Sequence, residues 1–379
     1  MKNLILNSLE IRNFRCFKHL QIERLGRVNL IVGKNNVGKS TLLEALQLYT
    51  YGGSPNLIWK ILQARDESKL YSPKRASRLT PESLLPDLKH LFYGRKEIGR
   101  SIESISIGPS DSLNNIVFIS VGWYARQRVE EGLPSHFRLL QPDEYDMVEN
   151  ATARFTIKRG ELSRSYPLKS AITLEELEIK ANSIFIAPGG LDDELIGTLW
   201  NEIALTDLEK DVVEAMRIIA PGVERLNVVG NFDSRERFVG NGEIRERETI
   251  PIVKIVGSDE RITLRSLGDG MQRIFGLALA LVNAKDGILL IDEIENGLHY
   301  SVQLDIWQMV FQLAHRLNVQ VFATTHSRDC IEAFQKASKE SVQEEGLLIR
   351  LQNKADEISA VLYDEEDLAV AAREQIEVR

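Results

Sequence analysis

Apolar residues recur along the chain in patterns that switch between strand-like and helical spacing. Alternating apolar positions across residues 9–22 predict two short strands joined by a turn. The apolar run RVNLIV, residues 27–32, predicts a buried strand that stops at Gly33. Beyond Ser40 the apolar residues adopt helical spacing, and a glycine pair at 52–53 ends the pattern. The N-terminal unit is therefore predicted to be a strand, a glycine loop and a helix.

The middle of the chain changes character several times. Residues 54–100 are polar and broken by prolines, which restricts any long helix. The β-rich runs SIESISI, NNIVFISV and ARFTIKR within residues 101–168 predict an antiparallel sheet. Residues 191–219 follow helical spacing with a cap signal at 206–207, and residues 245–256 predict a further strand.

From Ser266 onward the chain returns to regular α/β alternation, and it shows no internal repeat and no sustained heptads. We therefore predict an α/β fold with a mixed central sheet, an antiparallel β subdomain and a helical insertion. Residues 1–53 and 260–379 are expected to form one core, with residues 54–259 inserted between them. The elements predicted in the last part are helices at 271–284 and 301–317 and strands at 287–291, 319–323, 347–351 and 358–363.

Composition narrows the class of protein. The chain has 379 residues, of which 43% are hydrophobic, so it can bury a full core. A formal net charge of −8 argues against a surface that binds nucleic acid everywhere, but it leaves room for a local basic face. No apolar run is long enough to span a bilayer and no secretory signal is visible, which favours a cytoplasmic protein without a membrane partner. Cys16 and Cys330 have neither disulfide nor metal-ligand spacing.

The segment GKNNVGKS, from Gly33 to Ser40, matches the pattern of a phosphate-binding loop in full and lies between a predicted strand and helix. Its glycines let backbone N–H groups converge on phosphate oxygens at the helix N-terminus. Lys39 would reach the β- and γ-phosphates, and the Ser40 hydroxyl would bind Mg²⁺. A turn that merely needs glycine is the alternative, which a second motif disfavours. We predict ATP and Mg²⁺ as cofactors, with nucleotide contacts from Gly33, Asn36, Gly38, Lys39, Ser40 and Thr41.

That second motif, GILLIDEIE at 287–295, is an apolar strand that ends in two carboxylates. Asp292 would hold Mg²⁺ together with Ser40, and Glu293 would polarise the attacking water. Hydrophobic strands that end in acids are common, so the motif gains its meaning from the phosphate loop. The alternative for Glu293 is a solvated residue at a strand end.

Two further segments fit the same chemistry. ATTHS, residues 323–327, follows another apolar strand, and His326 would hydrogen-bond the γ-phosphate rather than serve as an ordinary core or surface histidine. RSLGDGMQR, residues 265–273, brings Ser266 and Gly268 to the start of a predicted helix, where anions bind. An ordinary capped helix is the alternative for the second segment.

Taken in this order, the motifs resemble the ABC-type ATPases related to SMC and RecF proteins, and most closely the ATPase domain of the OLD (overcoming lysogenization defect) family. The opening LEIRNFRCFKHLQI resembles the first strands of that group, and GKNNVGKS resembles its Walker A motif. GILLIDEIENGLH resembles Walker B and the D-loop. Glu295, Leu298 and His299 match the carboxylate and the leucine–histidine pair that follow the two acids in that family. ATTHS resembles the H-loop, and RSLGDG stands where the LSGGQ signature falls.

The resemblance implies that two protomers, or a higher homo-oligomer, sandwich ATP between the phosphate loop of one and the signature of the other. The partner's site would then be completed by Ser266 and Gly268. Arg265 replaces the usual leucine and Leu267 the first glycine, which predicts slow or partner-stimulated hydrolysis. Gln127 and Gln141 are both candidates for the Q-loop glutamine, and the residues around them do not decide between the two.

OLD-type nucleases carry a Toprim domain with clustered acidic metal ligands. The segment after Ser327 is too short for that fold, and the acids at 364–367 are typical of a charged helix start. We therefore expect an ATPase subunit of a two-component antiphage defence system, with the Toprim-type nuclease or another effector on a separate chain.

A RecF-like ATPase that binds DNA directly for repair or recombination shares every motif and stays open. A membrane-transporter ATPase uses the same nucleotide sandwich but is disfavoured by the NFRCF opening and the long insertion. For DNA contact, basic residues are densest between 74 and 100, although such stretches are often solvated loops. The basic residues there are Lys74, Arg75, Arg78, Lys89, Arg95, Lys96 and Arg100.

Overall fold

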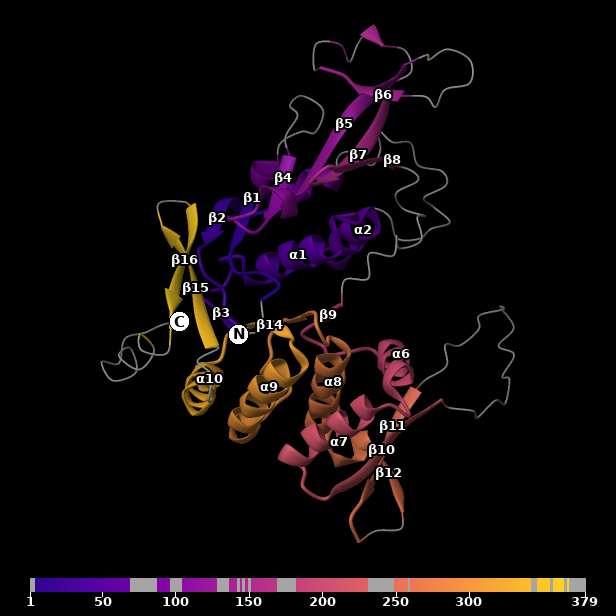
Figure 1. Cartoon of the computed structure of the whole chain (residues 1–379), viewed down its shortest axis with the longest axis vertical. Helices are drawn as coiled ribbons and strands as arrows, with labels where there is room; N and C mark the ends of the chain where they lie inside the picture. The colour runs from indigo at the N-terminus through magenta and orange to yellow at the C-terminus, as the bar shows by residue number, and fades with distance from the viewer. Residues whose placement is uncertain are drawn as a thin grey trace.

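The computed structural model describes most of the chain (Figure 1). The described residues are 4–68, 87–95, 104–127, 136–141, 144, 147–148, 151–168, 182–230, 249–257, 260–341, 346–354, 357–364 and 367. Within these ranges, no helix is both long and apolar enough to cross a membrane.

A six-stranded sheet lies at the centre of the molecule and joins the two ends of the chain (Figure 1). Its strands are β3 (Val28–Val32), β9 (Ser183–Ile186), β13 (Ile288–Ile291), β14 (Gln320–Thr324), β15 (Gly346–Lys354) and β16 (Glu357–Tyr363). They are arranged in the order β16-β15-β3-β14-β13-β9. β15 and β16 pair antiparallel and all other neighbours pair parallel, so the mixed central sheet is confirmed.

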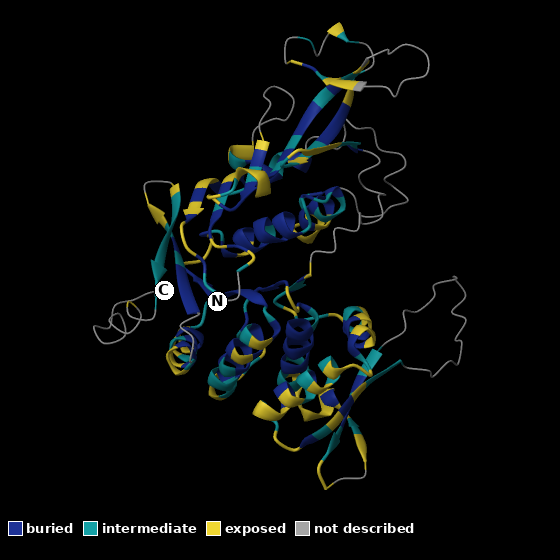
Figure 2. Ribbon diagram, viewed as in Figure 1, coloured by how far each residue is buried: buried dark blue, intermediate teal, exposed yellow. Residues whose placement is uncertain are grey.

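The strands β3, β13 and β14 are buried throughout, and their successive residues point to opposite sides of the sheet. In β13, Leu289 and Ile291 pack with the helices α8, α9 and α10, whereas Ile288 and Leu290 belong to the core that contains α1. Figure 2 shows the buried sides of these helices facing the sheet. The helices are α1 (Lys39–Thr50), α8 (Asp269–Asn283), α9 (Gln303–Leu317) and α10 (Arg328–Glu340).

A second sheet covers the far side of α1 (Figure 1). Its strands are β1 (Leu9–Phe14), β2 (Phe17–Ile22), β4 (Ser104–Gly108), β5 (Val117–Gln127), β6 (His136–Leu139), β7 (Thr152–Arg159) and β8 (Leu162–Pro167). All pairs are antiparallel, in the order β2-β1-β4-β5-β7-β8 with β6 beside β5. The antiparallel sheet predicted from the runs within residues 101–168 is confirmed, and the N-terminal hairpin forms part of the same sheet. The short helix α2 (Pro55–Ala64) follows α1, with Pro55 in its first turn.

A third, smaller lobe packs on α8 at the lower end of the molecule in Figure 1. It contains α6 (Asp193–Ile203), α7 (Asp207–Ile219) and a sheet of β10 (Val223–Gly230), β11 (Thr249–Ile255) and β12 (Arg261–Thr263). The two predicted helices are confirmed, with Asp192 and Thr206 capping them. Sequence periodicity missed the strands β9, β10 and β12 and the helices α2 and α10. β9 lies inside the predicted insertion but pairs with β13, and the division into domains stays a prediction.

Short 3-10 turns connect these elements. They are η1 (Lys89–Leu91), η2 (Tyr93–Arg95), η3 (Leu113–Asn115), η5 (Leu264–Leu267) and η6 (Tyr300–Val302).

Candidate functional site

The carboxyl ends of the parallel strands β3, β14 and β13 lie at one edge of the central sheet. Three of the predicted motifs lie at the ends of these strands. The phosphate loop follows β3, the two carboxylates follow β13, and ATTHS begins within the last residues of β14. The crevice outside the strand ends is where ligands of open α/β sheets bind. The topology therefore brings together segments that are far apart in the sequence.

The phosphate loop is shaped by backbone angles and close contacts that require glycine. Gly38 has φ of 93°, and a Cβ there would lie 2.7 Å from Cys16 Sγ and 2.8 Å from Phe17 Cζ. Gly33 has φ of 143°, and a Cβ there would collide with the Leu351 carbonyl. Asn36, with φ of 62°, is a left-handed residue that turns the loop between them.

Lys39 lies inside this loop. Its ammonium group donates hydrogen bonds to the carbonyl of Gly33 at 2.7 Å and of Lys34 at 3.0 Å. The side chain is buried, with only 6% of the residue exposed. A positive charge is therefore held within the curve of the loop, where phosphate oxygens bind in this motif.

Ser40 and Asp292 meet at the mouth of the loop. The Ser40 hydroxyl donates to Asp292 Oδ1 at 3.3 Å, which joins α1 to the end of β13. Oxygen ligands of this kind, a hydroxyl and a carboxylate, are those that Mg²⁺ prefers. The side chains present therefore fit the predicted metal.

Glu293 follows Asp292 in a left-handed conformation, with φ of 51°. This backbone geometry costs a non-glycine residue about 1–2 kcal/mol. The Glu293 N–H donates to Thr324 Oγ1 at 2.9 Å. His326 Nε2 lies 3.8 Å from Glu293 Oε1, too far for a hydrogen bond, and both side chains are partly exposed.

The Glu295 carboxylate binds the backbone at His326. Its Oε1 accepts the backbone N–H groups of His326 at 2.8 Å and of Ser327 at 3.1 Å. Ser327 is the N-cap of α10, and its hydroxyl accepts the Cys330 N–H at 3.2 Å. A carboxylate at a helix N-terminus is favoured by the helix dipole.

The signature-like segment lies apart from these residues. Ser266 is in η5 and donates its hydroxyl proton to the Thr263 carbonyl at 2.6 Å, and Gly268, with φ of 109°, caps α8. Both residues are exposed. Among the described residues, neither makes a hydrogen bond to the phosphate loop, so the chain by itself does not join the two motifs.

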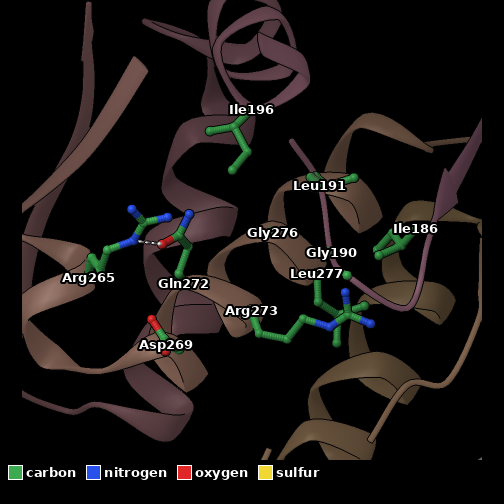
Figure 3. Close-up of a pocket in the computed structure, with 11 residues that line it drawn as sticks. Ile186, Gly190, Leu191, Ile196, Arg265, Asp269, Gln272, Arg273, Gly276 and Leu277 are labelled. Atoms are coloured by element: carbon green, nitrogen blue, oxygen red, sulfur yellow. Dashed lines mark hydrogen bonds between the residues drawn. The ribbon is translucent and has the colours of Figure 1, made fainter. Parts of the chain in front are cut away.

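A cavity of about 200 Å³ lies beside this segment, between α8, the loop after β9 and the start of α6 (Figure 3). In its wall, Arg265 donates to Gln272 at 3.1 Å. Arg273 reaches from the cavity to the end of β13, donating to the carbonyls of Ala187 at 3.0 Å and Glu293 at 3.4 Å. Burial lowers the pKa of the Arg273 guanidinium, against the attraction of Glu295 and Glu293. Helix α8 is thus connected to the backbone of Glu293.

Comparison with known proteins identifies the class. A sequence profile of the AAA ATPase domain matches residues 4–56 and 191–331, just over half of the chain. The chain belongs to this family. Its matched ranges contain the phosphate loop, the signature-like segment, both carboxylates and His326.

Two relatives align with most of this AAA ATPase domain protein. An ATP/GTP phosphatase of Helicobacter pylori is 23% identical, with 89% of each chain covered. The DNA replication and repair protein RecF of Rickettsia typhi is also 23% identical, over 88% of this chain and 98% of its own. Among solved structures, an SMC head bound to the C-winged helix domain of ScpA gives a TM-score of 0.50 at 13% identity, covering 95% of this chain and 98% of that chain. The AAA ATPase domain here thus has the ABC-type fold of an SMC head.

A partly buried ion-pair cluster lies beside the first turns of α1 in the ATPase domain, and sequence reasoning missed it. Arg15 and Arg65 both bind the Glu44 carboxylate, at 2.7 and 2.6 Å. Arg65 also donates to the Thr41 hydroxyl at 3.4 Å. Burial raises the pKa of Glu44 despite these two cations. Thr41, predicted to contact nucleotide, is buried and directed toward this cluster.

Other expectations lie at the edge of the described structure or outside it. Gln127 ends β5 and Gln141 follows β6, at the outer end of the second sheet (Figure 1), so the Q-loop residue stays open. Of the basic stretch, Lys89 and Arg95 are described in η1 and η2, while Lys74, Arg75, Arg78, Lys96 and Arg100 lie outside the described residues. Glu365 and Glu366 also lie outside, and the described residues contain no metal-binding cluster of three or more His, Cys, Asp or Glu.

Proposed function

We propose that the chain hydrolyses ATP at the sheet edge formed by the phosphate loop, Asp292, Glu293 and His326. The observation that carries this proposal is a chain of hydrogen bonds at the strand ends. The hydroxyls of Ser40 and Thr324 both donate to Asp292, and the Glu293 N–H donates to Thr324. Membership of the AAA ATPase domain family supports the same activity.

Each side chain has a distinct proposed role. Lys39 and the loop N–H groups bind the β- and γ-phosphates, and Ser40 and Asp292 hold the metal. When bound, Mg²⁺ neutralises charge that develops on the phosphates. Glu293 accepts a proton from the attacking water, and His326 contacts the γ-phosphate.

We further propose that the active form is a homodimer or a higher homo-oligomer. Ser266 and Gly268 are exposed at the start of α8 and do not reach the phosphate loop of their own chain. In the partner's site they would supply hydrogen-bond donors where charge develops, so hydrolysis would depend on assembly.

At the level of biology, we propose an ATPase subunit of an OLD-like two-component antiphage system in the cytoplasm. It would control a Toprim-type nuclease or another effector on a separate chain. The support is the likeness of GILLIDEIENGLH and the other motifs to the OLD family.

A RecF-like ATPase that binds DNA directly is the second candidate. It is favoured by the RecF protein of Rickettsia typhi, which aligns over nearly its whole length. Direct binding would fall with salt, because counterions are released from DNA phosphates.

One experiment tests the activity and separates the two biological readings. The Glu293→Gln protein is purified with and without ATP and Mg²⁺, and its mass and partners are determined by light scattering and mass spectrometry. We expect ATP to be retained, hydrolysis to stall and an ATP-bound dimer to accumulate, whereas Lys39→Ala should not bind ATP. Wild-type turnover in Glu293→Gln would remove Glu293 from the mechanism.

A small acidic protein that co-purifies would support the two-component system. A nucleotide-gated dimer without a partner would favour the RecF-like reading, and DNA binding at several salt concentrations would then be measured.

A further inference from the structure

Thr324 is the last residue of β14 and joins the two carboxylate residues of the site. Its hydroxyl donates to Asp292 Oδ1 at 2.6 Å and accepts the Glu293 N–H at 2.9 Å. A hydroxyl has a single proton, so the donor of Thr324 is committed to Asp292. One oxygen atom therefore connects the side chain of Asp292 with the backbone of Glu293.

The backbone of Thr324 holds the next residue as well. Its carbonyl accepts the Ile294 N–H at 3.1 Å. Glu293, which has φ of 51°, thus lies between two hydrogen bonds to Thr324. A left-handed residue persists where the surrounding contacts hold it in place. Here the N–H of Glu293 and the N–H of the next residue both donate to Thr324.

Packing alone does not explain a threonine at this position. Thr324 is 1% exposed, and the three residues before it, 321–323, are apolar and fully buried. A buried hydroxyl is unfavourable unless it is hydrogen-bonded, and valine has the same shape without that requirement. The hydroxyl is therefore present for the contacts that it makes.

These contacts also orient Asp292. Ser40 and Thr324 both donate to Oδ1. Within the described part of the chain, Oδ2 of Asp292 has no hydrogen-bond partner, so that oxygen remains free to face a cation or its water. Mutation of residues that orient a metal ligand in this way typically lowers metal affinity or activity by about 10- to 100-fold.

We infer that Thr324 is a positioning residue whose hydroxyl fixes Asp292 for Mg²⁺ and Glu293 for the attacking water in one arrangement. The inference rests on the proposed function. In this role Thr324 acts through Asp292 and Glu293, the two residues that its hydroxyl contacts. Loss of the hydroxyl should weaken nucleotide binding in the presence of Mg²⁺ and leave nucleotide binding without Mg²⁺ unchanged.

The test compares Thr324→Val, Thr324→Ser and Thr50→Val. Thr50 is a matched control, because it is buried but its hydroxyl donates to Gln47 within its own helix, at 3.0 Å. Calorimetry measures the affinity for the non-hydrolysable analogue AMP-PNP, once with Mg²⁺ and once with EDTA, and kcat is measured in parallel. We expect Thr324→Val to lose Mg²⁺-dependent affinity and kcat by about 10- to 100-fold, with unchanged affinity in EDTA. Thr324→Ser and Thr50→Val should resemble wild type.

Three results would overturn the inference. Equal losses of affinity with Mg²⁺ and with EDTA would mean that Thr324 acts through the phosphate loop or the fold. A Thr324→Ser protein as impaired as Thr324→Val would assign the effect to the methyl group. Wild-type behaviour of Thr324→Val would leave the residue without a role. If the wild type binds AMP-PNP but does not hydrolyse ATP, the proposed activity fails while the binding comparison still reports on Thr324.

Discussion

Gly38 lies where the phosphate loop turns into α1, and its missing side chain is a structural requirement. The backbone has φ of 93°, and the position of a Cβ is occupied by Cys16 and Phe17 of the N-terminal hairpin. Lys39 and Ser40 follow at once, so any shift at Gly38 displaces both proposed ligand groups. The glycine pattern could be read from sequence, whereas the contact with Cys16 could not, because the second sheet brings it there.

We predict that Gly38→Ala weakens ATP binding by about tenfold or more, because the added methyl group forces the loop to move. Gly257→Ala is the control, since Gly257 also has a positive φ, of 82°, but nothing lies within 4 Å of its Cβ position. Titration with ATP and a thermal melt of each protein measure the effect. Equal ATP affinity in wild type and Gly38→Ala would show that the loop tolerates the methyl group.

At the scale of elements, the contact between Glu295 and the start of α10 decides where His326 lies. Periodicity predicts the strand before His326 and the apolar strand before Glu295. It does not predict that one carboxylate oxygen accepts two backbone N–H groups from the neighbouring strand-to-helix turn. That contact exists because β13 and β14 are adjacent and parallel.

We predict that Glu295→Ala lowers the free energy of unfolding by about 1–3 kcal/mol, because the His326 N–H loses its acceptor and the Ser327 N–H keeps only the Thr325 hydroxyl. It should also lower kcat more than it changes ATP affinity, since His326 loses its support. Urea denaturation and steady-state kinetics measure both effects. Glu332→Ala on the exposed side of α10 is the control, and a loss of stability equal to that of the control would contradict the assigned role.

At the scale of the whole molecule, the exposed signature-like segment predicts composite sites. If each site takes its phosphate loop from one protomer and Ser266 from the other, two inactive variants can complement each other. We expect Lys39→Ala and Ser266→Arg proteins to be inactive alone and to recover about a quarter of wild-type ATP turnover when mixed in equal amounts. This recovery comes from mixed dimers that contain one intact site.

Turnover is measured before and after mixing over a range of protein concentrations. Two copies of Lys39→Ala with different tags are mixed as the control and should stay inactive. No recovery, with exchange of subunits shown by co-purification of the tags, would mean that each chain completes its own site.

The sequence by itself determined the local chemistry of this protein. The phosphate loop, the strand that ends in Asp292 and Glu293, and the histidine after the next strand are each encoded within a few consecutive residues, as are the main helices and strands. Tertiary structure alone decided which groups meet. Thr324 reaches Asp292, Arg273 reaches the Glu293 carbonyl, and Cys16 packs against Gly38 through contacts between segments distant in the chain. Periodicity indicates which face of an element is buried. Strand order and the packing of whole sheets determine which residues contact that face.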